Sequence, residues 1–176
     1  MDNVALVEVR MDLIEELYAA HAEIGENDHG FSNPSFGYDR ARFTAYAGLL
    51  IDHARGVNLP AGFVPQTTYA LLQGDRVVGI SRLRHALNEH LRRNGGHIGY
   101  FIRQRYRGCG YGNGILSLTL SQAWRLGLDQ VLLTVHAGNT PSRRVIARNG
   151  GRLEAEDPQS GLCSYWIQRT GGRVGP

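Results

Sequence analysis

The sequence predicts a mixed α/β fold in a single domain of 176 residues. Three observations support this prediction. Segments in which apolar and polar residues alternate, as in strands, are interspersed with segments of helical periodicity. Two β-prone runs flank a short turn at residues 73–75, which is typical of a hairpin. Finally, an apolar strand leads through a glycine-rich turn at residues 105–114 into an amphipathic helix.

The first half of the chain is predicted to contain a strand, two helices and the hairpin. Residues 25–37 are rich in turn formers and predict a loop, and the prolines of residues 58–66 predict extended or looped chain. The second helix is expected to end at Gly56. The predicted elements are residues 4–10 (strand), 11–24 and 38–56 (helices) and 67–85 (hairpin).

The second half is predicted to alternate strands and helices. Residues 129–135 are almost uniformly apolar, so we expect this strand to lie centrally in the sheet. The last helix is expected to have Thr140 as its cap and Pro141 in its first turn. The elements are residues 86–96 (a short helix or ordered loop), 97–102 (strand), 113–127 and 140–151 (helices), 152–156 and 163–169 (strands), and a frayed tail at 170–176.

Composition excludes several classes of protein. The sequence contains no run of about 18 apolar residues, which a membrane span would require. The acidic start of the chain does not resemble a signal peptide. Two cysteines, Cys109 and Cys163, cannot form a disulfide framework, so we expect a reducing, cytoplasmic location. All 19 basic residues are arginine, which excludes any mechanism that requires a lysine of this chain.

Charge is distributed unevenly. Residues 1–60 contain ten carboxylates and four arginines, whereas residues 61–176 contain fifteen arginines and six carboxylates. The pattern fits either a scattered solvated surface or two partners, a polyanion for the larger part and a cation near the first third. No stripe of arginines with interleaved aromatic residues is present, so nucleic acid is not expected as a partner.

The segment RYRGCGYGNG, residues 105–114, is the most informative stretch. A strand that passes through glycines into a helix creates an anion site, because unpaired N–H groups and the helix dipole meet there. A phosphate loop of the lysine-containing type is excluded. The dinucleotide pattern G-x-G-x-x-G fails because its third glycine falls on Asn113 or Ile115. The pattern that fits is R-x-x-G-x-G, with Arg107, Gly110 and Gly112.

Three segments resemble one known family. YFIRQRYRGCGYGNGILSL looks like the acetyl-coenzyme A signature of the GNAT-type N-acetyltransferases. NTPSRRVIARNGG is similar to the start of the family's next helix and its closing Asn-Gly, and RLRHALNEHLRRNGGHIGYFIR resembles an uncharacterised bacterial branch of predicted acetyltransferases. The resemblance implies a mostly antiparallel, twisted sheet splayed in its middle and flanked by about four helices. Residues 1–62 would form the acceptor side and residues 64–170 the acetyl-CoA-binding core.

The resemblance also implies direct acetyl transfer from acetyl-CoA to an amine, with no covalent enzyme intermediate and no metal. The pantetheine arm would pair with the backbone of Tyr100, Phe101 and Ile102. The pyrophosphate would bind N–H groups of the turn, whose residues are Arg107, Gly108, Cys109, Gly110, Tyr111, Gly112 and Asn113.

Several of these residues allow two interpretations. Arg107 either contacts phosphate or braces the turn, and Asn139 either touches the cofactor arm or caps a helix. Ser142 either faces coenzyme A or packs. Cys109 stands where the family often has a basic residue.

Catalysis requires a proton acceptor, because an ammonium group must lose a proton before its nitrogen can attack a thioester. The strand at residues 97–102 contains no acid, so His97 is the candidate base, unless it is a structural histidine. Glu89 is the other candidate, unless it lies on an exposed helix with ordinary salt links. Ile146 occupies the position of the family's usual tyrosine acid, so Tyr165, Tyr100 or water would have to replace it.

The acceptor is the part that the sequence defines least. The acidic first sixty residues would suit a cationic amine, with the loop at 25–37 and the segment after residue 60 as pocket walls. A non-catalytic module that binds acyl-CoA, an enzyme with another acyl donor, and a homodimer are all left open by the sequence.

Overall fold

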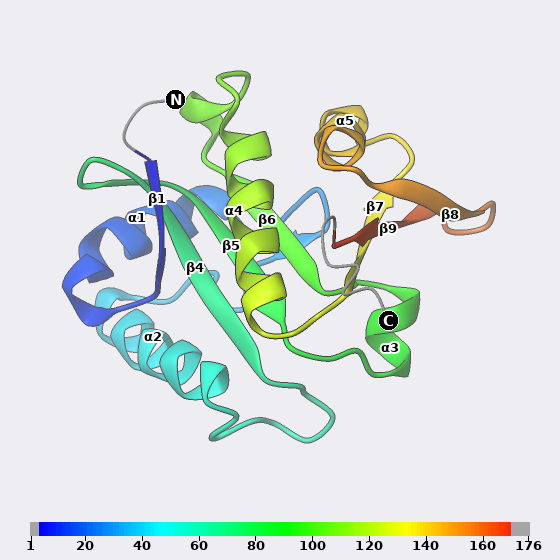
Figure 1. Cartoon of the computed structure of the whole chain (residues 1–176). Coiled ribbons are helices and arrows are strands. Elements are labelled where there is room, and N and C mark those ends of the chain that lie inside the picture. Colours follow the sequence, from blue (N-terminus) through cyan, green and yellow to red (C-terminus); the bar gives the residue numbers. More distant parts are fainter. Residues whose placement is uncertain (1–3, 170–176) are drawn as a thin grey trace.

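The computed structural model describes residues 4–169, in which two antiparallel sheets are flanked by helices (Figure 1). The four-stranded sheet has the order β1 (Val4–Glu8), β4 (Gln66–Gln73), β5 (Arg76–Arg84) and β6 (Ile98–Ile102). The three-stranded sheet has the order β7 (Gln130–His136), β9 (Leu162–Gln168) and β8 (Arg152–Asp157). No helix within these residues is long and apolar enough to cross a membrane. The predicted frayed tail at 170–176 lies outside the described residues.

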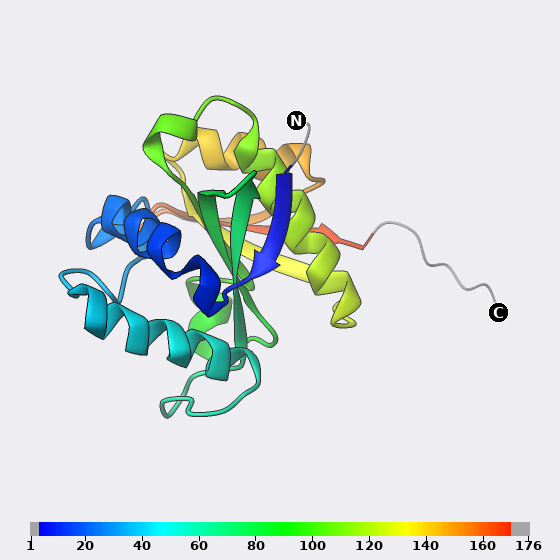
Figure 2. The same cartoon turned by 90° about the vertical axis from the view of Figure 1, so that its left-hand side faces the viewer.

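Helices cover both faces of the larger sheet (Figure 2). On one face lie α1 (Ile14–Ile24), preceded by a 3-10 turn η1 (Met11–Leu13), and α2 (Arg40–Ala54). On the other face lies α4 (Tyr111–Arg125), which follows a second 3-10 turn, η2 (Gln104–Tyr106). The remaining elements are α3 (Glu89–Arg93), α5 (Thr140–Arg148) and a small hairpin of β2 (Asn27–Asp28) and β3 (Phe31–Ser32).

Alternation along the strands gives the sheet two apolar faces. Phe43 and Leu17 pack with Ile80 and Phe101 between the sheet and the first two helices. On the opposite face the core includes Leu83, Ile98, Leu116, Leu133 and Ile167, which connects the four-stranded and three-stranded sheets. The two sheets therefore share one core although they are separate hydrogen-bonded units.

The sheets are joined at one point, where residues 95–97 meet β7. The main-chain N–H of His97 donates to the carbonyl oxygen of Leu132 at 2.7 Å, and the N–H of Gly95 donates to Oγ1 of Thr134 at 2.8 Å. Gly96 has φ +60°, and a Cβ atom there would lie 2.4 Å from the Leu132 oxygen. Beyond this junction, no strand pairing joins β6 to β7 within the described residues. The junction therefore holds together two strands that are otherwise apart.

The predicted order of elements is confirmed, with four differences of detail. The predicted loop at 25–37 contains the β2–β3 hairpin, and the central helix begins at Tyr111, two residues earlier than expected. Asn139, and not Thr140, caps α5, because its side chain accepts the N–H of Ser142. The strand expected to be central, β7, pairs only with β9, because its other edge borders the split between the sheets.

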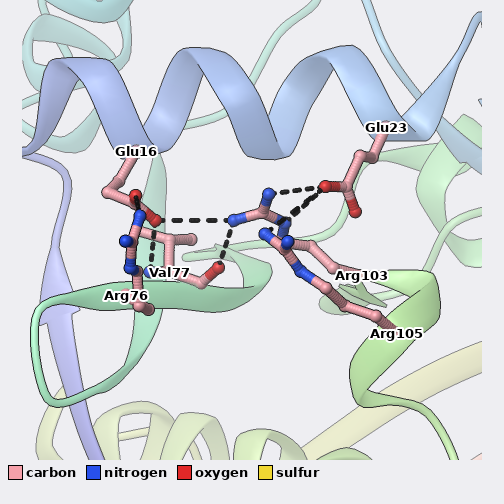
Figure 3. A network of polar contacts seen from close by, with 6 residues as sticks. All are labelled: Glu16, Glu23, Arg76, Val77, Arg103 and Arg105. Carbon is pink, nitrogen blue, oxygen red and sulfur yellow. Dashed lines mark hydrogen bonds and ion pairs between the residues drawn. The ribbon is translucent and has the colours of Figure 1, made fainter.

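A buried arginine ties α1 to the sheet (Figure 3). Arg103 follows β6 and is 3% exposed, and its guanidinium forms ion pairs with Glu16 and Glu23 of α1. It also donates to the carbonyl oxygen of Val77 at 2.9 Å, while Arg76 pairs with Glu16 at 2.7 Å. The hydrogen bond from Arg103 holds the pKa of Glu23 below its ordinary value. Carboxylates of the acidic N-terminal third are thus neutralised inside the fold.

We predict that Arg103→Met lowers the free energy of unfolding by about 2 kcal/mol. The reason is that both carboxylates lose their buried partner, although water still reaches them in part. Urea denaturation measures the loss. The matched control is Arg40→Met, which removes an exposed arginine paired with Glu15 and should cost much less. Equal losses in the two variants would contradict the assignment of Arg103 as a structural anchor.

Candidate functional site

A cleft of about 600 Å³ opens where β6 and β7 are not paired. Its walls are these two strands, the segment 107–113 that leads into α4, the start of α5 and the β2–β3 hairpin. A cleft of this size is typical of sites for cofactors and small molecules. The split in the sheet therefore creates the candidate active site.

At one end of the cleft, α4 begins without a side-chain cap. Its N-cap residue is Gly110, with φ +87°, and Gly108 has φ +76°, a region that favours glycine. The starts of α2 and α5, by contrast, are capped by the side chains of Asp39 and Asn139. Uncapped N–H groups and the positive end of the helix dipole make the start of α4 suited to an anion.

Glycine is needed at position 112 for a different physical reason. A Cβ atom at this position would lie 3.2 Å from Cγ2 of Val145, so a side chain would press against α5. The glycine thus lets α4 and α5 approach each other closely. The glycines of the turn serve two purposes, since Gly108 and Gly110 shape the backbone and Gly112 permits helix packing.

Arg107 braces the turn. Its Nε donates to the carbonyl oxygen of Ile102 at 2.9 Å, and Nη2 pairs with Asp28 in the β2–β3 hairpin. Of the two roles expected from the sequence, the geometry favours bracing. Because Arg107 also lines the cleft, its charge still contributes to the positive potential there.

The structure gathers most of the predicted cofactor residues around the cleft. Asn139 caps α5 and lines the cleft together with Ser142, so capping and contact with a ligand are compatible. Cys109 is exposed and Tyr111 is buried, and neither is among the residues that line the cleft. The predicted residues that do line it are Tyr100, Phe101, Ile102, Arg107, Gly108, Gly110, Gly112, Asn113, Asn139 and Ser142.

The candidate base His97 is part of the junction between the sheets and does not line the cleft. Its Nδ1 accepts the main-chain N–H of Leu132 at 2.9 Å, so the neutral ring carries its proton on Nε2. Burial, and then the charges of Arg92 and Arg84, lower the pKa of His97 to about 4. An imidazole whose lone pair is already engaged is poorly suited to act as a base, so the geometry favours a structural histidine.

The other two catalytic candidates also lie away from the cleft. The side chain of Glu89 is 93% exposed at the start of α3, where it lies 3.5 Å from Arg93 in an ordinary helical ion pair. The hydroxyl of Tyr165 accepts a hydrogen bond from Nε of Arg143 at 2.9 Å. His97, Glu89 and Tyr165 are therefore not brought together at one site.

Tyr100, which the sequence offered both as a backbone contact and as a possible replacement for the missing acid, does line the cleft. Its hydroxyl oxygen is buried and has no hydrogen-bond partner among the described residues. Burial raises the pKa of Tyr100, and the nearby Ser142 side chain offsets part of this shift without meeting hydrogen-bond geometry. The cleft thus contains a protonated hydroxyl that is free to donate.

Two arginines of β5 also line the cleft and were missed. Arg82 and Arg84 project from the same face of the strand as the core residue Ile80. The signal that could have found them is the presence of arginines at buried positions of an otherwise apolar strand. Arginine is almost never fully buried unless it is paired.

Comparisons with known proteins agree with this architecture. A family profile described as "Acetyltransferase (GNAT) domain" matches residues 39–152. No curated protein sequence matches the chain significantly.

Three solved structures share the fold at low sequence identity. An acetyltransferase from Salmonella typhimurium that modifies the N-terminal serine of a 50S ribosomal subunit protein is 13% identical, with a TM-score of 0.69 over 96% of each chain. A GNAT-family acetyltransferase from Bacillus anthracis is 16% identical, with a TM-score of 0.64 over 95% of each chain. A microcin self-immunity acetyltransferase is 15% identical, with a TM-score of 0.69 over 96% of this chain and 94% of that one.

The junction histidine leads to a prediction about pH. The pKa of His97 in the folded state is about 4, below its ordinary value of 6.5, so the folded protein binds fewer protons than the unfolded chain between these values. Its contribution to stability is fully present above about pH 6.5 and is lost as pH falls toward 4, at up to about 1.4 kcal/mol per pH unit. We expect His97→Gln to make the pH dependence of the free energy of unfolding shallower in this window.

Urea denaturation at several pH values measures this difference between variant and wild type. His21, whose pKa is also lowered to about 4 by burial and by Arg82, keeps its own contribution in both proteins. The control is His90→Gln, at an exposed position, which should leave the slope unchanged. A slope in His97→Gln equal to that of the wild type would show that the ring is not held neutral by the junction.

Proposed function

The chain belongs to the GNAT family of acetyltransferases, and from this premise we propose that it transfers an acetyl group from acetyl-CoA to an amine of a small molecule or peptide. The observation that carries the proposal is the uncapped start of α4 at one end of a cleft between two unpaired strands. Such a site offers N–H donors for a diphosphate and an open strand edge for the rest of the donor. The microcin enzyme of similar fold was solved with acetyl-CoA and AMP, which supports the same donor here.

The donor fits the residues that line the cleft. Its diphosphate would bind the N–H groups at the start of α4, next to Gly110 and Asn113. Its pantetheine arm would lie along β6, because β6 pairs with β5 on one edge and has no partner strand on the other. Asn139 and Ser142 face the same channel from α5.

The reaction requires a neutral amine and a proton for the leaving thiolate. The amine nitrogen attacks the thioester carbonyl, a carbon–nitrogen bond forms, the carbon–sulfur bond breaks, and the sulfur takes up a proton. Asp28 is the only carboxylate among the described residues of the cleft, and it is engaged by Arg107. We therefore assign proton removal to water in the open cleft and not to a carboxylate base.

Tyr100 is our candidate for the proton donor to the leaving thiolate. Its pKa is raised by burial, so the hydroxyl is protonated at neutral pH. Tyr165, the alternative considered from the sequence, is already hydrogen-bonded to Arg143. Ile146, which occupies the family's usual tyrosine position, is buried in the core yet lines the same cleft as Tyr100.

Release of free coenzyme A from acetyl-CoA in the presence of a panel of amines tests the function. We expect Tyr100→Phe to lower kcat by about tenfold while the Kd for coenzyme A changes little, because general acid catalysis contributes only to the chemical step. A thiol-reactive dye follows turnover and calorimetry follows binding. Binding of acetyl-CoA without turnover of any amine would instead favour a non-catalytic acyl-CoA module. An unchanged kcat would remove Tyr100 as the acid.

A charge placed in the first turn of α4 tests the diphosphate site. We predict that Asn113→Asp weakens coenzyme A binding about tenfold, since the new carboxylate repels the diphosphate. The same carboxylate interacts favourably with the positive end of the helix dipole, so thermal stability should stay equal or rise slightly. Weaker binding without loss of stability separates repulsion from misfolding. Unchanged affinity would mean that the diphosphate does not bind at the start of α4.

A further inference from the structure

The side of the cleft nearest α1 and α2 carries positive charge that the protein itself does not neutralise. Arginines line the cleft from several elements, whereas its one carboxylate among the described residues, Asp28, pairs with Arg107. The acidic residues of α1 are also engaged, because Glu15, Glu16 and Glu23 all pair with arginines outside the cleft. The expectation of a cationic acceptor therefore finds no support in the charges around the site.

Arg82 is the centre of this positive region. It is 5% exposed on β5 and forms no ion pair with any residue of the described part of the chain. Its Nη1 donates to the carbonyl oxygen of Ser32 at 2.9 Å, and its guanidinium carbon lies 4.3 Å from the centroid of the Phe31 ring. Its Nη2 is buried and has no hydrogen-bond partner within residues 4–169. A buried guanidinium that lacks an anionic partner is costly, and a bound anion would remove this cost.

No carboxylate of residues 4–169 lies within ion-pairing distance of Arg82. The titratable groups whose charges couple to it are Tyr46, His21 and Arg84; burial, and then the positive charge of Arg82, lower the pKa of His21 to about 4 and that of Arg84 to about 10. Arg84, two residues further along the same face, donates Nη1 to the carbonyl oxygens of Gly95 and Gly96 at 3.0 Å each. Two guanidinium groups thus lie on one wall of the cleft, both bound only to neutral carbonyl oxygens.

The position of Arg82 separates it from the diphosphate site. Arg82 lies opposite Gly99 in the register of β5 and β6, on the sheet face that packs against α1 and α2. The start of α4 lies at the opposite face of the sheet (Figure 2), where Tyr111 and Ile115 pack with Val78. An anion at Arg82 would therefore belong to the molecule that enters from the acceptor side.

We propose that the acceptor is an amine that also carries an oxyanion, a carboxylate or a phosphonate, and that Arg82 binds this oxyanion so that the amine points toward the thioester. The proposal rests on the function proposed above. Guanidinium groups bind carboxylates and phosphate-like oxyanions through charge-assisted hydrogen bonds, and Arg82 has an unused donor for this purpose. An amino acid or an aminoalkylphosphonate has the required chemistry, whereas a polyamine does not.

Binding to the complex of the enzyme with coenzyme A tests the proposal directly. Calorimetry compares the common α-amino acids, their primary amides, the matching 1-aminoalkylphosphonates and spermidine. We expect at least one acid or phosphonate to bind about 30-fold or more tightly than its neutral amide, as expected for a charge-assisted hydrogen bond. The preference between carboxylate and phosphonate identifies the oxyanion.

Substitutions test whether Arg82 causes the preference for the oxyanion over the neutral amide. Arg82→Gln should abolish the preference for the charged compound and leave the Kd for coenzyme A within about twofold, which also shows that the variant is folded. Arg82→Lys should retain part of the preference. Arg125→Gln removes an exposed arginine of α4 that does not line the cleft, and it should change nothing. Equal binding of acids and amides, or a preference that persists in Arg82→Gln, would overturn the proposal.

Turnover by the same compounds separates the two proposals. If oxyanion amines bind through Arg82 but no amine releases coenzyme A, anion recognition stands and the acetyltransferase function fails. If spermidine and the amides are acetylated as fast as the acids, the function stands and oxyanion recognition by Arg82 is wrong.

Discussion

A single short junction between two sheets determines the architecture of this protein. His97 bonds to Leu132 through its own N–H and through its ring, and Gly96 allows the main chains to come close enough for both contacts. Because the strands pair only there, the remainder of β6 and β7 can stand apart while the shared core keeps both sheets in one domain. The cleft, its open strand edge and the approach to α4 all follow from this arrangement.

The charge distribution of the chain is explained by the same structure. Glu16 and Glu23 of α1 are not available to a cation, because they bind arginines at the start of β5 and in the segment after β6 (Figure 3). These pairs hold α1 against the sheet. Some of the arginines in the later part of the chain thus form structural ion pairs, and others line the cleft.

Local features of the fold and site could be predicted from the sequence, whereas contacts between residues far apart in the sequence could not. Periodicity and glycine positions are local, so the order of elements and the anion site at Gly108 and Gly110 were accessible. The role of His97 depends on Leu132, 35 residues away in the sequence, and its ring had to be seen in place to distinguish a hydrogen-bond acceptor from a base. The sequence also could not show that the hydroxyl of Tyr100 and Nη2 of Arg82 lack hydrogen-bond partners, because this depends on how several distant segments pack around them.

The chemical identity of the buried cation at position 82 has a consequence for an enzyme that handles an activated acyl group. In the arrangement that we propose, a lysine there would present a primary amine to the thioester, and on losing its proton it would compete with the incoming substrate and become modified itself. A guanidinium stays protonated and is a poor nucleophile, so it can hold a fixed charge near the donor without being consumed. Since the whole chain lacks lysine, none of its side chains offers an ε-amine that could intercept the acetyl group during the reaction.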